Sequence, residues 1–255
     1  MKRVIPFQQV VEAVSALCGK AASAGERVGV HRYSAELLLF ICLSKRLRER
    51  YAERGIADSI WYDSMCDLKW KLWECKAVKG VYGSFVASWF DGWFKLTRFA
   101  LGRLQFEIEH FDGEYHLGTM VLTPSTKVIN VHIPRTLTPL DKQSREDSYR
   151  RAAEFFRDEL DGAPTVFVCH SWLLYPPAEK ILPSHSNIRG FMADYEIVRY
   201  GENKENEHPD MWRLFDMDFT GDAADFPEDS SLRAAYKKFL MDGNRTGWGY
   251  GVFIA

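Results

Sequence analysis

Hydrophobic residues recur at helical spacing through roughly the first hundred positions of the chain. This spacing predicts four helices, over about residues 7–19, 34–51, 58–73 and 80–96. Ser34 and Asp58 have the side chains expected of N-caps for the second and third helices. Leu37, Leu38 and Ile41 are expected to face inward from the second helix. The first part of the chain is therefore predicted to be helical.

From Leu101 onward the period changes from helical spacing to alternation. Leu104, Phe106 and Ile108 alternate with polar residues, which predicts a half-buried strand with one polar face. Asp112-Gly113 is a hairpin signal, and a second strand is predicted over His116–Leu122.

A strand, a helix and a second strand follow one another with short joints between 128 and 174. The first strand is the β-branched run Val128–Ile133. The helix carries an apolar stripe at Tyr149, Ala152, Ala153, Phe156 and Leu160. The second strand lies within 165–174. Such a βαβ unit predicts parallel strands.

Ligands in open α/β sheets bind at the carboxyl ends of parallel strands. Here those ends carry His132 on the first strand and Cys169, His170 and Ser171 on the second. The sequence therefore directs attention to this end of the βαβ unit.

Capping residues mark two more helices near the end of the chain. Ser186 is expected to cap a short helix and Ser230 a longer one, with a short helix at Met211–Phe215 between them. A strand is predicted over Tyr195–Tyr200. The terminal GWGYGVFIA is predicted to be a strand whose glycines indicate close approach of another backbone or a bulge.

Composition narrows the class of protein. The 255 residues are 46% hydrophobic, enough for a real core in one large or two small domains. A net charge of -2 predicts no nucleic-acid or acidic-membrane partner. The five cysteines are odd in number and lack CxxC spacing, which predicts no metal site, no disulfide framework and a cytoplasmic location. The longest apolar run, 37–43, is too short to span a bilayer.

Several segments occur in an order that resembles a known family. They are LGRLQFE (101–107), VHIP (131–134), SYRRAAEFF (148–156), CHSWLLYP (169–176) and SNI (186–188). The chain resembles a bacterial family of acyltransferase-domain proteins, with a helical N-acyltransferase N-terminal domain and a GNAT-like C-terminal domain. The resemblance implies an α+β protein with an α/β-like core, in which a helical domain (1–97) packs on a GNAT-like mixed-sheet domain (98–255).

The resemblance also implies transfer of an acyl group from acetyl-CoA or another acyl-CoA to an amine of a small molecule. GNAT enzymes bind the CoA pyrophosphate through a glycine-containing loop before a helix. The equivalent loop here, 134–144, contains no glycine. Arg135, Thr136 and Thr138 are the residues in it that could contact phosphate.

Acyl transfer to an amine needs a base and donors to the carbonyl oxygen. Glu107 is the first candidate base, because GNAT enzymes often use a strand glutamate; alternatively it is an exposed residue or a partner of Arg103. His132 and His170 are candidate bases or, alternatively, core imidazoles bonded to backbone. Ser171 is a candidate hydroxyl donor.

Two further residues are candidates for binding the substrate. Gln105 shares the polar face of its strand with Glu107, and Tyr175 is a candidate acid for a thiolate. Two other functions stay open. One is a non-catalytic ligand-binding or interaction protein, suggested by the glycine-free loop. The other is a hydrolase in which Ser171 or Cys169 acts with His132.

Overall fold

The structure, a computed structural model, describes residues 32–205 and 207–255. The chain divides into two compact units, Met1–Thr97 and Arg98–Ala255. We propose that these units are the two domains expected from the sequence, with the boundary at residue 98. The helix predicted over 7–19 lies outside the described residues.

The described part of the first unit is helical. Its elements are α2 (Arg32–Glu53), α3 (Asp58–Lys79), the 3-10 helix η2 (Ala87–Phe90) and α4 (Asp91–Phe94). The helices α2 and α3 pack against each other, and the Trp61 indole donates to the carbonyl of Ser44 at 3.0 Å. A left-handed Gly80 ends α3.

The buried stripe of α2 differs from the predicted one. Leu37, Phe40 and Leu47 are buried, whereas Leu38 and Ile41 are 60% and 47% exposed. Steps of three and seven residues keep Leu37, Phe40 and Leu47 on one side of the helix, and Leu38 and Ile41 lie one position beyond it. The prediction that Leu38 and Ile41 face inward was therefore wrong.

Neither predicted cap in this unit caps a helix. Ser34 lies inside α2 and donates its hydroxyl to the carbonyl of Tyr82 at 2.5 Å. Asp58 is the first residue of α3 rather than its N-cap, and pairs with Arg48 at 2.5 Å.

The single helix predicted over 80–96 is also wrong. After Gly80 the chain turns, and regular structure resumes only in η2 and α4. The nitrogen of Ser84 donates to the carbonyl of Tyr33 at 3.0 Å, and Gly83 lies so close to the Tyr33 backbone that a side chain would collide with it. Glycine permits this approach and disfavours a helix, so tertiary contact overrides the aromatic periodicity.

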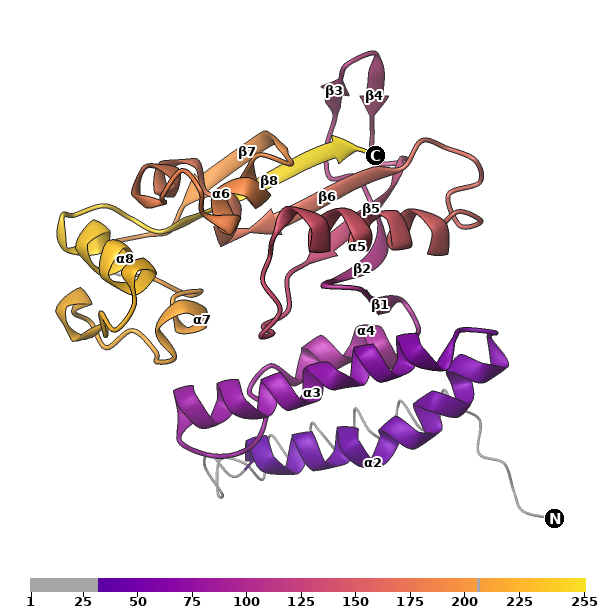
Figure 1. The fold of residues 1–255 in the computed structure, drawn as a ribbon, viewed down its shortest axis with the longest axis horizontal. Helices are drawn as coiled ribbons and strands as arrows, with labels where there is room; N and C mark the ends of the chain where they lie inside the picture. Colours follow the sequence, from indigo (N-terminus) through magenta and orange to yellow (C-terminus); the bar gives the residue numbers. More distant parts are fainter. Residues whose placement is uncertain (1–31, 206) are drawn as a thin grey trace. The chain divides into compact units, whose positions relative to one another are not determined.

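The second unit is built on a six-stranded mixed sheet in the order β1-β2-β5-β6-β8-β7. Only the β5–β6 pair is parallel, as the βαβ pattern predicted. A separate hairpin contains β3 and β4 (Figure 1). The strands are β1 (Arg98–Leu101), β2 (Leu104–His110), β3 (Tyr115–Leu117), β4 (Met120–Leu122), β5 (Lys127–His132), β6 (Val166–Ser171), β7 (Glu196–Glu202) and β8 (Gly247–Ile254).

Helices connect these strands. They are α5 (Lys142–Phe155), η3 (Trp172–Leu174), η4 (Pro176–Ile181), α6 (Asn187–Met192), α7 (Trp212–Phe215), η5 (Ala223–Asp225) and α8 (Ser231–Met241). The Ser186 and Ser230 side chains cap α6 and α8, accepting from backbone N–H groups at 3.2 Å. Both predicted caps are confirmed.

Two glycine turns were missed by the alternation pattern. Gly102, with φ 80°, separates β1 from β2, so the strand region begins at Arg98 rather than Leu101. Gly118, with φ 60°, divides the predicted strand His116–Leu122 into β3 and β4, which pair with each other. Positive φ is readily adopted by glycine, which makes both turns possible.

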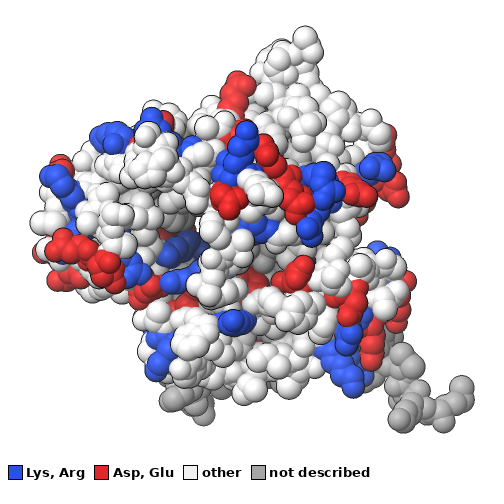
Figure 2. All heavy atoms as spheres, viewed as in Figure 1, with Lys and Arg blue, Asp and Glu red and all other residues white. Residues whose placement is uncertain are grey.

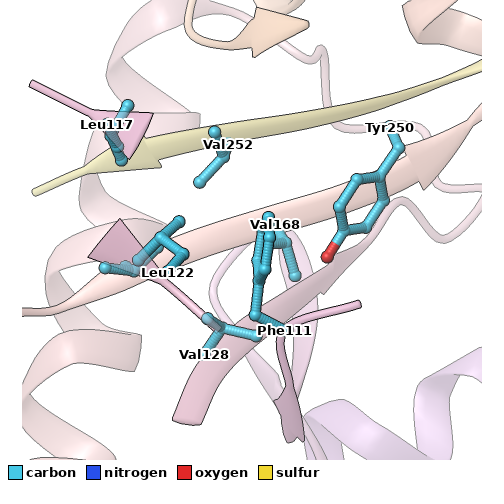
Figure 3. Close-up of a cluster of buried hydrophobic side chains, with 8 residues drawn as sticks. Phe111, Leu117, Leu122, Val128, Val168, Tyr250 and Val252 are labelled. Atoms are coloured by element: carbon cyan, nitrogen blue, oxygen red, sulfur yellow. The ribbon is translucent and has the colours of Figure 1, made fainter. Parts of the chain in front are cut away.

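The two faces of the sheet have different covers. On one face α5 places Tyr149 against Phe106, Phe167 and Phe253, with ring centroids 6.4, 5.3 and 4.9 Å away. On the other, the β3–β4 hairpin closes an apolar cluster shown in Figure 3. Its members are Phe111, Leu117, Leu122, Val128, Val166, Val168, Tyr250 and Val252. We call this second face the hairpin-side face.

The glycines of β8 permit the close packing that the sequence suggested. A side chain at Gly249 would collide with the Leu174 carbonyl, and one at Gly251 with the Tyr195 ring. Lys, Arg, Asp and Glu side chains are interspersed over the molecular face drawn in Figure 2. Among the described residues, no helix is long and apolar enough to cross a membrane.

Candidate active site

Strand register brings three predicted site residues onto the hairpin-side face. In the antiparallel β2–β5 pair, Gln105 lies opposite His132 and Glu107 lies opposite Asn130. Directly opposed residues share a face of the sheet, and side chains two positions apart along a strand share it too. Gln105, Glu107 and His132 therefore form one polar group at the carboxyl end of β5.

Glu107 receives several hydrogen bonds on a single oxygen. His132 Nε2 lies 2.6 Å from Glu107 Oε1, and the Arg98 guanidinium reaches the same oxygen from Nη2 at 2.7 Å and Nε at 3.3 Å. The side chains of Arg98 and Glu107 are each only 12% exposed. A carboxylate at Nε2 favours the imidazole tautomer that carries its lone pair on Nδ1.

The surroundings keep Glu107 ionised. Burial by itself raises the pKa of a carboxyl group, but the hydrogen bonds from His132 and Arg98 and their charges outweigh it, so the pKa of Glu107 is lowered. A carboxylate with a lowered pKa is a weak base. The geometry therefore suits Glu107 better as the partner of His132 than as the base itself.

His170 lies at the same level as His132 on the neighbouring strand. The parallel strands pair at Ile129–Phe167 and Asn130–Val168, and the pairing stops before either histidine. The His170 ring packs on Trp248 with centroids 4.7 Å apart. Burial, followed by the nearby Arg199 charge, lowers the pKa of His170, so its imidazole is neutral at pH 7.

Ser171 and Cys169 point away from the two histidines. Alternation along β6 assigns them to the face covered by α5, whereas His170 lies on the hairpin-side face. The Ser171 hydroxyl accepts from the Leu173 nitrogen at 3.1 Å and so caps η3. Cys169 is fully buried, and burial raises the pKa of its thiol. This arrangement disfavours a hydrolase that uses either residue with His132.

The loop between β5 and α5 is held by side chains from outside it. Arg103 donates to the carbonyls of Thr138 at 2.8 Å and Pro134 at 2.9 Å. Arg135 forms an ion pair with Asp216, which follows α7. Thr136 accepts from the Thr138 nitrogen at 3.1 Å. The loop therefore presents Arg135 and two threonines on a fixed backbone.

The start of α5 differs from a glycine-rich phosphate site. The Asp141 side chain caps the helix by accepting from the Ser144 nitrogen at 2.8 Å. A carboxylate therefore occupies the positive end of the helix dipole, where an anionic group would otherwise bind. Arg135 is the arginine of this loop, and it is paired with Asp216.

The two predicted substrate-binding residues have different surroundings. Gln105 is buried, and its Oε1 has no hydrogen-bond partner within the described chain. The Tyr175 hydroxyl donates to Glu202 at 2.9 Å, and burial followed by this hydrogen bond raises its pKa. Tyr175 is thus tied to β7, whereas Gln105 lies beside His132.

Arg98 is the site residue that sequence reasoning missed. The alternative considered for Glu107 was a pair with Arg103, but Arg103 contacts the β5–α5 loop. The two-residue turn at 102–103 places Arg98 directly opposite Glu107. Recognising Gly102-Arg103 as a hairpin turn would have predicted this cross-strand pair.

Two family models match the chain. The N-acyltransferase N-terminal domain matches residues 7–96, and the GNAT-like C-terminal domain matches residues 98–253, which is more than half of the chain. The chain belongs to the GNAT-like C-terminal domain family. The family predicted from the sequence is confirmed, and so is the fold class of a helical N-terminal region with a mixed-sheet domain.

Solved acyltransferases have the same fold. An acyltransferase in complex with decanoyl-CoA and teicoplanin, and one in complex with CoA and 10C-Teicoplanin, each match with a TM-score of 0.75 and 21% identity. Each match covers 89% of this chain and 68% of the other. No curated protein matches the chain. Within the described residues, no group of three or more His, Cys, Asp or Glu side chains could hold a metal ion.

Proposed function

We propose that this GNAT-like protein is an N-acyltransferase, which moves an acyl group from acyl-CoA to an amine of a small molecule. The observation that carries the proposal is the His132–Glu107 contact of 2.6 Å on the hairpin-side face, in a chain of this family. The bound acyl-CoA and teicoplanin of the structural neighbours support the two substrate classes. A supply of acyl-CoA also fits the cytoplasmic location expected from the cysteine content.

His132 is the proposed base. Its imidazole removes one proton from the ammonium of the acceptor, and Glu107 stabilises the imidazolium that forms. The neutral amine attacks the thioester carbon, forming a C–N bond. The C–S bond then breaks, and the thiolate leaves with the electron pair and takes the proton held by the His132 imidazolium. The second nitrogen proton passes to the regenerated imidazole and from there to solvent. The products are an amide and CoA.

His170 ends the neighbouring strand on the same face as His132, and we assign it the supporting role of donor to the thioester carbonyl oxygen. A neutral imidazole still carries one N–H donor, so the lowered pKa of His170 is compatible with this role. The Ser171 hydroxyl lies on the face covered by α5, where it accepts from Leu173, so it takes no part in this proposed step. The thiolate takes its proton from His132, and the Tyr175 hydroxyl already donates to Glu202.

Arg135 is the proposed phosphate-binding residue for CoA, with the hydroxyls of Thr136 and Thr138 beside it. Charge-assisted hydrogen bonds from a guanidinium suit phosphate oxygens. Because Asp141 already caps α5, the side chains of this loop replace the glycine-rich backbone as the source of donors.

The His132→Ala variant tests the catalytic proposal. Release of the CoA thiol would be measured with acyl-CoA and a panel of amines. We expect kcat/KM to fall by about 10²- to 10⁴-fold, the usual contribution of a general base. Glu107→Gln should lower kcat by a smaller factor. Glu154→Gln, at an exposed position of α5, is the control and should have the same activity as the unmodified protein. Unchanged turnover in His132→Ala would remove His132 from the mechanism.

A further inference from the structure

The spare polar atoms beside His132 are hydrogen-bond acceptors. All recorded bonds to Glu107 end on Oε1, and Oε2 accepts none within the described chain. Gln105 Oε1 is buried and likewise without a partner there. Asn130 uses Nδ2 to donate to Glu109 Oε1 at 2.9 Å. Unmet acceptors of this kind are complementary to a group that only donates, as an ammonium does.

The charges on this strip of β2 and β5 sum to a negative value. Arg98 compensates Glu107 through their ion pair. Glu109 lies two residues further along β2 on the same face, is exposed, and forms no ion pair within the described residues. Arg199, which lies over the Tyr250 ring on the same face, is paired with Asp112. The strip therefore carries one carboxylate, Glu109, that no ion pair compensates within the described residues.

The position of Glu109 is fixed relative to the reacting centre. Asn130 donates to Glu109 in the same way that His132 contacts Glu107. In both cases the β5 side chain reaches the β2 residue two positions beyond the one directly opposite it. Two residues along an extended strand advance by about 7 Å. Asn130 is thus a positioning residue for the Glu109 carboxylate, which lies two residues along β2 from Glu107.

We propose that the acceptor is a diamine, with the amine to be acylated at His132 and Glu107 Oε2 and its second ammonium at Glu109. The inference rests on the proposed N-acyltransferase function and names its acceptor class. Gln105 lies directly opposite His132 on the neighbouring strand, and its Oε1 adds an acceptor for the reacting amine. An extended four-carbon diamine covers a span similar to that of the two carboxylates.

The test compares 1,4-diaminobutane with n-butylamine, which have the same carbon chain and differ by one ammonium. In the unmodified protein we expect kcat/KM to be about tenfold higher for the diamine, as for a hydrogen bond between charged groups. Glu109→Gln should raise KM for the diamine and so bring this ratio to within about twofold of unity. Glu109→Lys should invert it, because it sets like charges against each other.

Glu154→Gln serves as the matched control, because it removes an exposed carboxylate from α5 on the other side of the sheet. It should keep the full diamine preference. A ratio near one in the unmodified protein, or a ratio that survives in both Glu109 variants, would overturn the diamine proposal while leaving the N-acyltransferase proposal intact. Failure to acylate either amine or any other acceptor would instead overturn the N-acyltransferase proposal, and the diamine assignment with it.

Discussion

At the residue scale, the central feature is the Glu107 carboxylate, in which Oε1 accepts hydrogen bonds and Oε2 accepts none within the described chain. Arg98 and His132 both donate to Glu107 Oε1 in a mostly buried position. The arrangement orients the imidazole and keeps the carboxylate charged. Its role in catalysis is a proposal, but its contribution to stability follows from the contacts themselves.

Glu107→Gln should destabilise the fold in a pH-dependent way. The folded-state pKa of Glu107 is lowered, so its carboxylate stabilises the protein above the unfolded value of about 4.3 and loses that effect as pH falls through the folded pKa. We expect a loss of about 1–3 kcal/mol in unfolding free energy at pH 7 and a smaller loss near pH 3. Urea unfolding at both pH values measures this. A loss that grows as pH falls would contradict it.

Alternation in the sequence was enough to place Gln105, Glu107 and Glu109 on one face of a strand. It could not supply their partners, because these depend on register. Arg98 meets Glu107 only because Gly102 turns the chain at a particular residue, and Asn130 meets Glu109 only in the observed pairing of β2 and β5. The candidate residues were therefore predictable, whereas the hydrogen bonds that relate them were not.

At the element scale, a buried arginine joins α5 to the chain around α6. Arg145 forms two hydrogen bonds to Asp194, at 2.6 and 3.1 Å, and a third to the Leu140 carbonyl at 2.8 Å. The Tyr149 hydroxyl also donates to Asp194, at 3.2 Å. The network holds the start of α5, and hence the β5–α5 loop, against the segment before β7.

Asp194→Asn should therefore cost far more stability than a surface substitution. Removing the charge leaves the Arg145 guanidinium, whose side chain is only 4% exposed, without its counter-ion. We expect a loss of about 3 kcal/mol in unfolding free energy. The matched control is Asp147→Asn on the same helix, where pairs with Arg150 and Arg151 are exposed and worth less than about 1 kcal/mol. Equal losses in the two variants would show that the network contributes no more than a surface pair.

Elements with strong local signals were predicted correctly. The serine caps of α6 and α8 and the parallel β5–β6 pair all follow from residues near each other in sequence. The breaks between elements that the pattern missed lie at glycines. Gly83 and Gly118 interrupt segments in which the apolar pattern continues without a break. The pattern of apolar residues does not reveal a close backbone contact, as at Gly83, or a positive φ angle, as at Gly118.

At the scale of the whole molecule, family membership and fold agree with an acyltransferase function, and the β5–α5 loop is the part that departs most from the glycine-containing GNAT loop. It has no glycine, its helix is capped by Asp141, and Arg135 is paired with Asp216. If acyl-CoA binds here, Arg135 must supply charge that a backbone loop supplies in other GNAT folds. Binding of CoA is thus a more direct test of the account than any change at the base.

The decisive measurement is a calorimetric titration of the purified protein with acetyl-CoA and a longer acyl-CoA, with desulfo-CoA as a control for recognition without the thiol. We expect saturable binding of the acyl-CoA ligands, weakened about tenfold in Arg135→Ala, the loss expected for one charge-assisted hydrogen-bonding group. Absence of binding to any of these ligands at millimolar concentration would contradict it, and the chain would then share the fold of N-acyltransferases without their co-substrate.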